Sequence, residues 1–281
     1  MRAMRVILEV QWGKLASQRA VITPGGSLRV GRTELSDVVI SHDRQMSGVH
    51  FEVSWDGACC VVRDLGSDTG TWLDGQEVRE GEARNTSWIR AGDTVFMVFF
   101  EGATAHPRPA DAPEVASIKE KARDALLAET TPLFALLDGA RDPRIRELLR
   151  ESVDDHRSLY EGVQGDALGE VAPYLVRLSP ESALFEKLVD EGWGRSWGVY
   201  LTSERPLPEV RRHLRRLSMV DAEGEAKRLY FRFQDPRVLR RFLVLSNLRQ
   251  RAEMFGVILE AFLMEGEQGE VLRAAHAPVA P

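Results

Sequence analysis

The stretch that decides the fold of the first part of the chain is Asp64-Leu65-Gly66-Ser67-Asp68-Thr69-Gly70-Thr71-Trp72-Leu73-Asp74-Gly75. It joins the β-rich run that ends at Asp64 to the next one at Thr71–Leu73, and small and acidic residues that favour turns fill its centre. Similar short runs, separated by glycine-rich turns, extend outward from it to about residues 5 and 100. Because none of them has helical periodicity, we expect a β-sandwich or barrel. The expected strands are Arg5–Val10, Arg19–Thr23, Leu28–Gly31, Val38–Ser41, His50–Trp55, Cys59–Asp64, Thr71–Leu73, Ser87–Arg90 and Thr94–Phe100.

Two further fragments precede this stretch at regular places in the pattern. Gly31-Arg32 ends one expected strand, and Ser47-Gly48-Val49-His50 opens another. In this order and spacing the fragments resemble the forkhead-associated (FHA) family, whose pattern is Gly-Arg, Ser-x-x-His, Leu-x-Ser-x-Asn-Gly-Thr and Asn-Gly. We therefore expect an FHA β-sandwich domain over residues 1–101. The resemblance implies a module that recognises phosphothreonine peptides and has no catalytic activity.

The chemistry of such a ligand explains the residue types at its site. A phosphothreonine carries about −1.5 to −2 charges and three acceptor oxygens, so it needs a cation and hydroxyl or amide donors held on a stiff scaffold. The resemblance gives these phosphate-contacting roles to Arg32 and Ser47. The candidate phosphopeptide-binding residues are Arg32, Arg44, Ser47, Gly48 and Thr69, and those with an expected structural role are Gly31, His50 and Gly70.

Three positions depart from the family pattern. Thr69 replaces the asparagine that holds the peptide backbone, and it offers one hydroxyl in place of a two-donor amide. Asp68 adds a carboxylate where a phosphate would approach, and Gly48 stands where many members have Arg or Asn, a loss for which Arg44 could compensate. Three interpretations stay open: the domain binds phosphothreonine, binds an unphosphorylated partner, or only braces its neighbour.

The composition argues against two classes of partner, nucleic acids and membranes. The net charge is −6 and the pI about 5.7, which argues against non-specific binding to nucleic acid or membranes. No stretch approaches the roughly 20 apolar residues that a membrane helix needs, and the first apolar run breaks at Glu9, so we expect a cytoplasmic protein. The two cysteines, Cys59 and Cys60, are adjacent, and this spacing fits neither a disulfide nor a zinc site.

The pattern changes after residue 101. Three prolines among small residues predict an extended linker over 102–115, followed by a second domain over 116–275 and a short tail at 276–281. In this second domain helical and strand patterns alternate, which predicts an α/β (α+β) fold with a helical C-terminal part. The expected helices include Ser117–Ala128, Arg144–Glu151, Ser182–Asp190, Glu209–Leu217 and Pro236–Leu248, and the expected strands Leu133–Leu137, Pro173–Leu178, Trp197–Leu201, Leu229–Phe233, Val257–Met264 and Glu270–Ala274.

Several phrases of the second domain carry another resemblance. The most specific reads Tyr230-Phe231-Arg232-Phe233-Gln234-Asp235-Pro236-Arg237-Val238-Leu239, and others are Leu133 to Ala140 and Trp197 to Ser203. Together they resemble the Tap/Tec adaptor-chaperones of bacterial type VI secretion. The family usually has Tyr where Gln234 stands. The resemblance implies that the domain binds a toxic effector and loads it onto the spike, the valine-glycine repeat protein, without being an enzyme.

The sequence contains none of the common motifs for catalysis or for phosphate binding by a glycine-rich loop. No His-Glu-x-x-His, nucleophile elbow or phosphate-binding loop occurs, so we expect no catalytic residues, no cofactor and no metal. The leading hypothesis is a bacterial cytoplasmic adaptor-chaperone whose partners are an effector, the spike and, where the FHA domain binds phosphate, a phosphothreonine protein. A phosphothreonine-binding scaffold in a Ser/Thr kinase pathway is the alternative, and an unrecognised enzyme the third.

Charge and local pattern select the candidate partner-binding residues of the second domain. Residues 205–251 contain 13 Lys or Arg against 5 Asp or Glu. This excess fits a solvated face, an acidic surface on cargo or spike, or nucleic acid. Asp235-Pro236 also fits a helix start, with Asp as N-cap and Pro at the first position. The candidates are Arg211, Arg212, Arg215, Arg232, Asp235 and Arg237.

Overall fold

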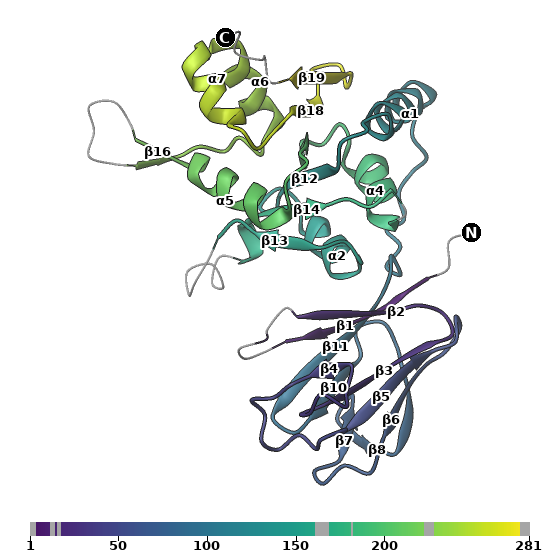
Figure 1. Ribbon diagram of the computed structural model, residues 1–281. Helices are drawn as coiled ribbons and strands as arrows, with labels where there is room; N and C mark the ends of the chain where they lie inside the picture. The colour runs from purple at the N-terminus through teal and green to yellow at the C-terminus, as the bar shows by residue number, and fades with distance from the viewer. Residues whose placement is uncertain are drawn as a thin grey trace. The chain divides into compact units, whose positions relative to one another are not determined.

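The computed structural model describes residues 4–11, 15, 18–160, 169–180, 182–221 and 228–275. The chain forms two compact units, Met1–His106 with Arg150–Val153, and Pro107–Leu149 with Asp154–Pro281. The strands of the first unit and the mixed helices and strands of the second can be followed in Figure 1. One hydrophobic cluster lies in the first unit and two lie in the second. The tail expected at 276–281 lies outside the described residues.

The first unit is built from two β-sheets. One has the order β2-β1-β11-β10-β7-β8 and the other β4-β3-β5-β6-β9. Their strands are β1 (Val6–Val10), β2 (Arg19–Ile22), β3 (Gly26–Gly31), β4 (Val38–Val39), β5 (Phe51–Trp55), β6 (Cys60–Asp64), β7 (Thr71–Leu73), β8 (Gln76–Val78), β9 (Glu80–Ala83), β10 (Trp88–Ala91) and β11 (Thr94–Phe100).

Alternation of side chains explains why these strands form a sandwich. Along β5 every second residue is buried, so Phe51, Val53 and Trp55 face the core while their neighbours are half-buried. The ring of Phe51 meets that of Phe96, on the other sheet, edge to face at 5.4 Å. The two sheets therefore share one core, and the expected all-β sandwich is confirmed.

The second unit has one six-stranded antiparallel sheet and a separate hairpin. The sheet has the order β13-β14-β12-β15-β18-β19, and the hairpin pairs β16 with β17. The strands are β12 (Leu133–Asp138), β13 (His156–Ser158), β14 (Pro173–Arg177), β15 (Gly198–Thr202), β16 (Met219–Asp221), β17 (Arg228–Tyr230), β18 (Ala261–Glu265) and β19 (Val271–Ala275). The helices are α1 (Pro113–Leu127), α2 (Pro143–Arg150), η1 (Gly169–Val171), α4 (Ala183–Lys187), η2 (Leu188–Gly192), α5 (Leu207–Leu217), α6 (Pro236–Leu245) and α7 (Leu248–Phe255).

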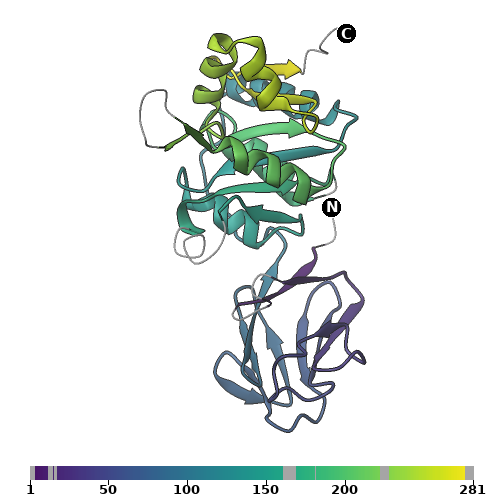
Figure 2. The ribbon, with the colours of Figure 1, turned by 60° about the vertical axis from the view of Figure 1, so that its left-hand side comes forward.

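Helices cover both faces of this sheet. The central strand β12 is buried almost throughout, with Ala135 and Leu137 in one cluster and Phe134 and Leu136 in the other. Residues of α1, α2 and α4 belong to the first cluster, and residues of α5, α6 and α7 to the second. Figure 2 shows α5, drawn in green, lying across the sheet. The expected multidomain architecture with an α/β second domain is thus confirmed.

Two expected helices have different ends. The first begins at Pro113 and not at Ser117, because proline is well suited to the first turn of a helix. The single helix expected at Pro236–Leu248 is two helices, α6 and α7. A capping box at Asn247 starts α7 and ends the run of helical backbone before it. Among the described helices none is long and apolar enough to cross a membrane.

Candidate peptide-recognition site and adaptor residues

Arg32 and Ser47 lie side by side at one end of the sandwich. Arg32 directly follows β3, and its backbone N–H donates to the Ser47 carbonyl at 3.0 Å. Its Nε donates to the Met46 carbonyl at 3.1 Å, which orients the guanidinium. The terminal guanidinium nitrogens have no protein partner among the described residues, and the side chain is exposed. Arg32 can therefore present a planar pair of donors to an anion.

His50 joins two loops of the site from inside the fold. It is completely buried, and its Nδ1 accepts from the Ser47 N–H at 3.1 Å. Its Nε2 lies 3.0 Å from the Gly70 carbonyl, to which it donates when Nδ1 is the acceptor. The imidazole thereby holds the loop before β5 against the loop before β7. His50 thus links the two loops through one hydrogen bond to each.

The glycines beside these loops allow close backbone contact. A Cβ on Gly31 would lie 2.3 Å from the Gly48 carbonyl oxygen, closer than any real contact. Gly70 has φ of 74°, in the left-handed region that favours glycine. The Gly48 carbonyl in turn accepts from the N–H and hydroxyl of Thr33, at 3.1 and 2.9 Å. Gly48 is thus placed by backbone bonds and presents no side chain to a ligand.

The Ser47 hydroxyl is already bonded to a carboxylate. Ser47 Oγ donates to Asp68 Oδ2 at 3.0 Å and accepts from the Asp68 N–H at 3.0 Å. Asp68 itself is exposed. A phosphate oxygen needs the same hydroxyl proton that Asp68 now uses, so the two anions compete for one donor. The sequence predicts repulsion between Asp68 and a phosphate, and the structure shows that Asp68 also occupies the Ser47 hydroxyl.

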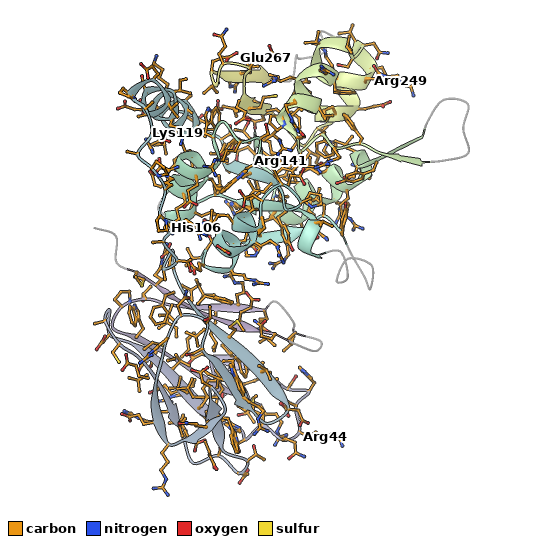
Figure 3. The ribbon with its side chains drawn as sticks, turned by 180° about the vertical axis from the view of Figure 1, so that it is seen from behind. Arg44, His106, Lys119, Arg141, Arg249 and Glu267 are labelled. Carbon is orange, nitrogen blue, oxygen red and sulfur yellow. The ribbon has the colours of Figure 1, made fainter. Side chains whose placement is uncertain are left out.

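Thr69 and Arg44 lie at the rim of the site. The Thr69 hydroxyl donates to the Gln45 carbonyl at 3.0 Å, and the residue is exposed. Arg44 is exposed and has no side-chain partner in the described part of the chain; Figure 3 shows it extending away from the strands. The Thr69 hydroxyl proton is therefore already used in a hydrogen bond, whereas the Arg44 guanidinium is available to a ligand.

Asp64 organises the loop that carries Asp68 and Thr69. Its carboxylate accepts from the N–H groups of Gly66 and Ser67 and from the hydroxyls of Ser67 and Thr71 at 2.6–3.0 Å. Burial acts to raise the pKa of Asp64, but these hydrogen bonds outweigh it and hold the pKa below its ordinary value. Asp64 is not among the residues predicted from sequence to build the site. An Asp followed closely by Gly and Ser is nevertheless a turn signal, and this signal identifies it as a loop-organising residue.

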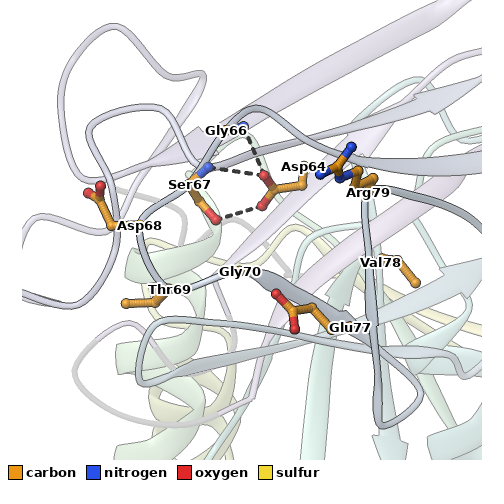
Figure 4. Close-up of a pocket in the computed structure, with 9 residues that line it drawn as sticks. All are labelled: Asp64, Gly66, Ser67, Asp68, Thr69, Gly70, Glu77, Val78 and Arg79. Carbon is orange, nitrogen blue, oxygen red and sulfur yellow. Dashed lines mark hydrogen bonds between the residues drawn. The ribbon is translucent and has the colours of Figure 1, made fainter.

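Hollows adjoin this loop on two sides. A cavity of about 620 Å³ is lined by the loop and by strand β8, and Figure 4 shows the Glu77 carboxylate beside Gly70 within it. A smaller hollow of about 190 Å³ is lined by Thr69, Trp72 and Arg90. Arg90 lies over the Trp72 ring at 4.7 Å, a cation–π contact. Thr69 and Gly70 line both hollows.

The adaptor candidates around the start of α6 are held by ion pairs. Asp235 is the N-cap of α6, with Pro236 in the first turn, as the local pattern predicts. Its carboxylate also accepts from Arg237 Nε at 2.9 Å and Nη2 at 2.6 Å. Burial acts to raise the pKa of Asp235, but the Arg237 bonds keep it lowered. Arg232 pairs with Asp138, a carboxylate almost completely buried at the end of β12.

The arginines of α5 do not share one exposed face. Arg211 is half-buried, and its guanidinium donates to the carbonyls of Ser158 and Tyr160 at 2.6 and 3.2 Å. Arg212 is exposed, while Arg215 is half-buried. Arg211 thus anchors a loop of its own unit, which the sequence pattern of the helix does not reveal.

Two further residues that the sequence analysis did not select complete this region. The rings of Tyr160 and Tyr230 lie 6.2 Å apart, and Tyr230 Oη accepts from Gln234 Nε2 at 3.1 Å. Burial raises the pKa of Tyr230, and so does the hydrogen bond between its hydroxyl, as donor, and Tyr160. A tyrosine at position 234, as the family usually has, could not donate an amide proton here. Within the described ranges no three His, Cys, Asp or Glu side chains gather as a metal site requires.

Comparisons with known proteins place a family on each unit. Residues 28–97 match the model of the FHA domain, and residues 133–253 match that of a domain of unknown function, DUF4123. A comparison with curated proteins gave no match.

Several solved FHA structures are similar to this chain. One, from work on phosphothreonine-dependent FHA domain interactions, is 26% identical over 37% of this chain and 99% of its own, with a TM-score of 0.32. The FhaA FHA domain complexed with the intracellular domain of Rv3910 is 27% identical over 33% and 98%, with a TM-score of 0.31. The FHA domain of the CT664 protein from Chlamydia trachomatis is 21% identical over 34% and 96%, with a TM-score of 0.32.

Proposed function

Since the chain joins an FHA domain to a DUF4123 domain of the Tap/Tec type VI secretion adaptors, we propose that it is an adaptor-chaperone for a secreted effector. It binds the effector in the bacterial cytoplasm and passes it to the valine-glycine repeat spike protein. FHA and DUF4123 are binding and adaptor domains, not enzyme families, so the proposed role is recognition without catalysis.

The observation that carries this proposal is the extent of the adaptor match. It runs from the start of β12 into α7 and so includes the central strand of the sheet, with α2 and α4 on one face and α5 and α6 on the other. The FHA match lies wholly within the other unit. Two recognition modules on one chain raise the effective concentration of a partner that contacts both.

The proposed role of the FHA domain is recognition of a phosphothreonine segment through Arg32. The free edge of the Arg32 guanidinium and the adjoining Ser47 hydroxyl support this role. Asp68 must give up the Ser47 hydroxyl when a phosphate binds, so binding is expected to be weaker than it would be without this carboxylate. Phosphorylation of the partner would then add to an affinity supplied mainly by the adaptor domain.

Co-purification tests the proposal directly. The full chain is co-expressed with each candidate effector encoded beside its gene, and retention is measured by affinity purification. We expect one effector to be retained and its yield of soluble protein to rise. If no effector is retained, the adaptor function is wrong.

A second measurement separates the two domains. Arg32→Ala is expected to abolish binding of a phosphothreonine peptide and leave effector retention largely intact. Arg84→Ala is the matched control, because Arg84 is an exposed arginine of the same domain. Phosphopeptide binding in a chain that retains no effector would support the alternative, a scaffold in a Ser/Thr kinase pathway.

A further inference from the structure

Large aliphatic side chains stand exposed where α6 ends and α7 begins. Val244 is 78% exposed, Leu245 83% and Leu248 84%, and we call these three residues the α6–α7 ridge. They follow Phe242 and Leu243, which are half-buried against the core of the second unit. The second half of α6 is therefore apolar on both its inner and its outer side. A helix of this kind is normally covered on both sides.

Scattered exposed aliphatic residues are ordinary on protein surfaces, but this arrangement is not scattered. Three of the five positions from 244 to 248 carry large apolar side chains that are more than three-quarters exposed. Contiguous exposed apolar groups of this kind commonly mark interaction sites. No contact within the described residues buries them.

The charged side chains along α6 and the first half of α7 have one sign. From Pro236 to Ala252 the chain contains five arginines and no acidic residue. Arg241 precedes Leu245 by four positions on α6, and Arg251 follows Leu248 by three on α7, so each lies beside a ridge residue on its helix. Arg249 is also exposed, and Figure 3 shows it extending outward from α7. An apolar centre with arginines around it is the composition of an interface core and rim.

Some of these arginines already have partners on α6 or α7, so we ask whether their guanidinium groups can still bind a carboxylate. Arg249 pairs with Glu253 on the same helix at 3.0 Å, a pair whose two side chains are both mostly exposed. Arg251 Nε donates to the Ser246 hydroxyl at 3.3 Å. Arg241 has no side-chain partner in the part of the chain that the structure describes. Such exposed pairs are weak, so an arriving carboxylate can compete for these guanidinium groups.

We propose that the α6–α7 ridge binds an acidic amphipathic helix of a partner protein. The apolar side of that helix covers Val244, Leu245 and Leu248, and its carboxylates meet the surrounding arginines. A second copy of this chain fits poorly, because a twofold pairing of ridges would bring one arginine rim against the other. The proposal rests on the proposed function only in taking this helix to belong to the cargo or the spike.

The test uses the full chain and a defined probe. The probe is a synthetic peptide of about 18 residues with leucines at helical spacing and glutamates on its flanks. One control peptide replaces the glutamates by lysines, and another replaces the leucines by serines. Binding is followed by fluorescence anisotropy at low and at high salt.

Paired variants identify the surface. Leu245→Ser with Leu248→Ser removes the apolar centre, and Arg241→Glu with Arg249→Glu reverses the rim. Leu35→Ser is the matched control, since Leu35 is 79% exposed and lies in the first unit. Because all these side chains are exposed, the melting temperature should stay within about 2 °C of wild type, so loss of binding does not reflect unfolding.

We expect the leucine–glutamate peptide to bind wild type and Leu35→Ser equally. The double serine variant should lose at least about tenfold in affinity, as expected for uncovering two leucines, and the rim variant about three- to fivefold at low salt. Equal binding to the double serine variant, or equal binding of the lysine peptide, would overturn the proposal. So would sedimentation that shows a ridge-dependent dimer of wild type.

Effector retention separates this proposal from the proposed function. If wild type retains an effector and the double serine variant retains as much, the ridge is not the docking surface but the adaptor function stands. If wild type retains no effector, the adaptor function fails, and the peptide titration still decides whether the ridge binds an acidic helix.

Discussion

Replacing Asp68 by asparagine should strengthen phosphothreonine binding. Asp68 Oδ2 accepts the Ser47 hydroxyl proton at 3.0 Å, and a phosphate oxygen bound to the same hydroxyl would approach to about 2.7 Å of Ser47 Oγ. The carboxylate and the phosphate would then lie about 4 Å apart. Asparagine keeps the shape of the side chain and an acceptor oxygen, so the variant changes mainly the charge.

The size of the effect follows from Coulomb's law. Two unit charges about 4 Å apart repel by about 1 kcal/mol in water, and a phosphothreonine carries about −1.5 to −2 charges. Salt screens part of this repulsion, because the Debye length is about 8 Å at physiological ionic strength. About 1–2 kcal/mol remains, which is a gain of roughly 5- to 30-fold in affinity.

Isothermal titration with a phosphothreonine peptide and its unphosphorylated form measures this gain. The control is Glu120→Gln, which removes one negative charge from α1 in the other unit. Only the phosphorylated peptide should gain affinity, and the gain should shrink as salt rises. If Asp68→Asn binds it within twofold of wild type, or if both peptides gain equally, Asp68 does not compete with a phosphate.

The other predictions concern stability, each measured by urea unfolding. Asp64→Asn should lower the free energy of unfolding at pH 7 by about 2 kcal/mol, because the carboxylate accepts several hydrogen bonds. The pKa of Asp64 is lowered in the fold, so the ionised carboxylate stabilises the fold above the unfolded pKa near 3.9, and this stability is lost as the pH falls through the folded pKa. The variant should therefore lose less stability than wild type between pH 5 and pH 2. An equal loss would contradict this role of Asp64. His50→Ala should cost about 2–3 kcal/mol by breaking the bonds to Ser47 and Gly70, and an unchanged transition would show that the two loops hold without it. Arg232→Ala should cost about 2 kcal/mol by leaving the buried Asp138 unpaired, whereas the double variant with Asp138→Asn should recover part of that loss.

In the FHA site the loops are held firmly, whereas the Ser47 hydroxyl is bonded to an exposed carboxylate that can be displaced. His50 and Asp64 hold the loops by buried or charge-assisted hydrogen bonds. The Ser47–Asp68 pair, by contrast, is exposed, and a bonded carboxylate in such a place is easily displaced. Breaking the Ser47–Asp68 contact would therefore leave the core of the sandwich undisturbed.

Local rules carried most of the fold prediction. Alternating apolar residues and glycine-rich turns depend only on neighbours in the chain, so they predicted nine strands of the sandwich and the alternation of helices and strands in the second unit. They missed β8 and β9, whose mostly exposed and half-buried residues give almost no apolar alternation. Helix-start chemistry at Asp235-Pro236 is equally local. The break between α6 and α7 was also readable, because Asn247 and Gln250 form a capping box, but the apolar run that spans the break was read as one helix.

Backbone pattern and motif spacing are properties of the chain alone, and they were enough to predict an FHA sandwich followed by an α/β domain. The partners of the polar residues, by contrast, depend on how distant segments pack together. Ser47 and Asp68 are 21 residues apart, and Asp138 and Arg232 are 94 apart, so nothing local indicates that either pair meets. Whether a leucine of α6 is covered or exposed likewise depends on which elements pack beside it. Partnership and burial are properties of the packed chain, and these properties decide which residues remain free to bind.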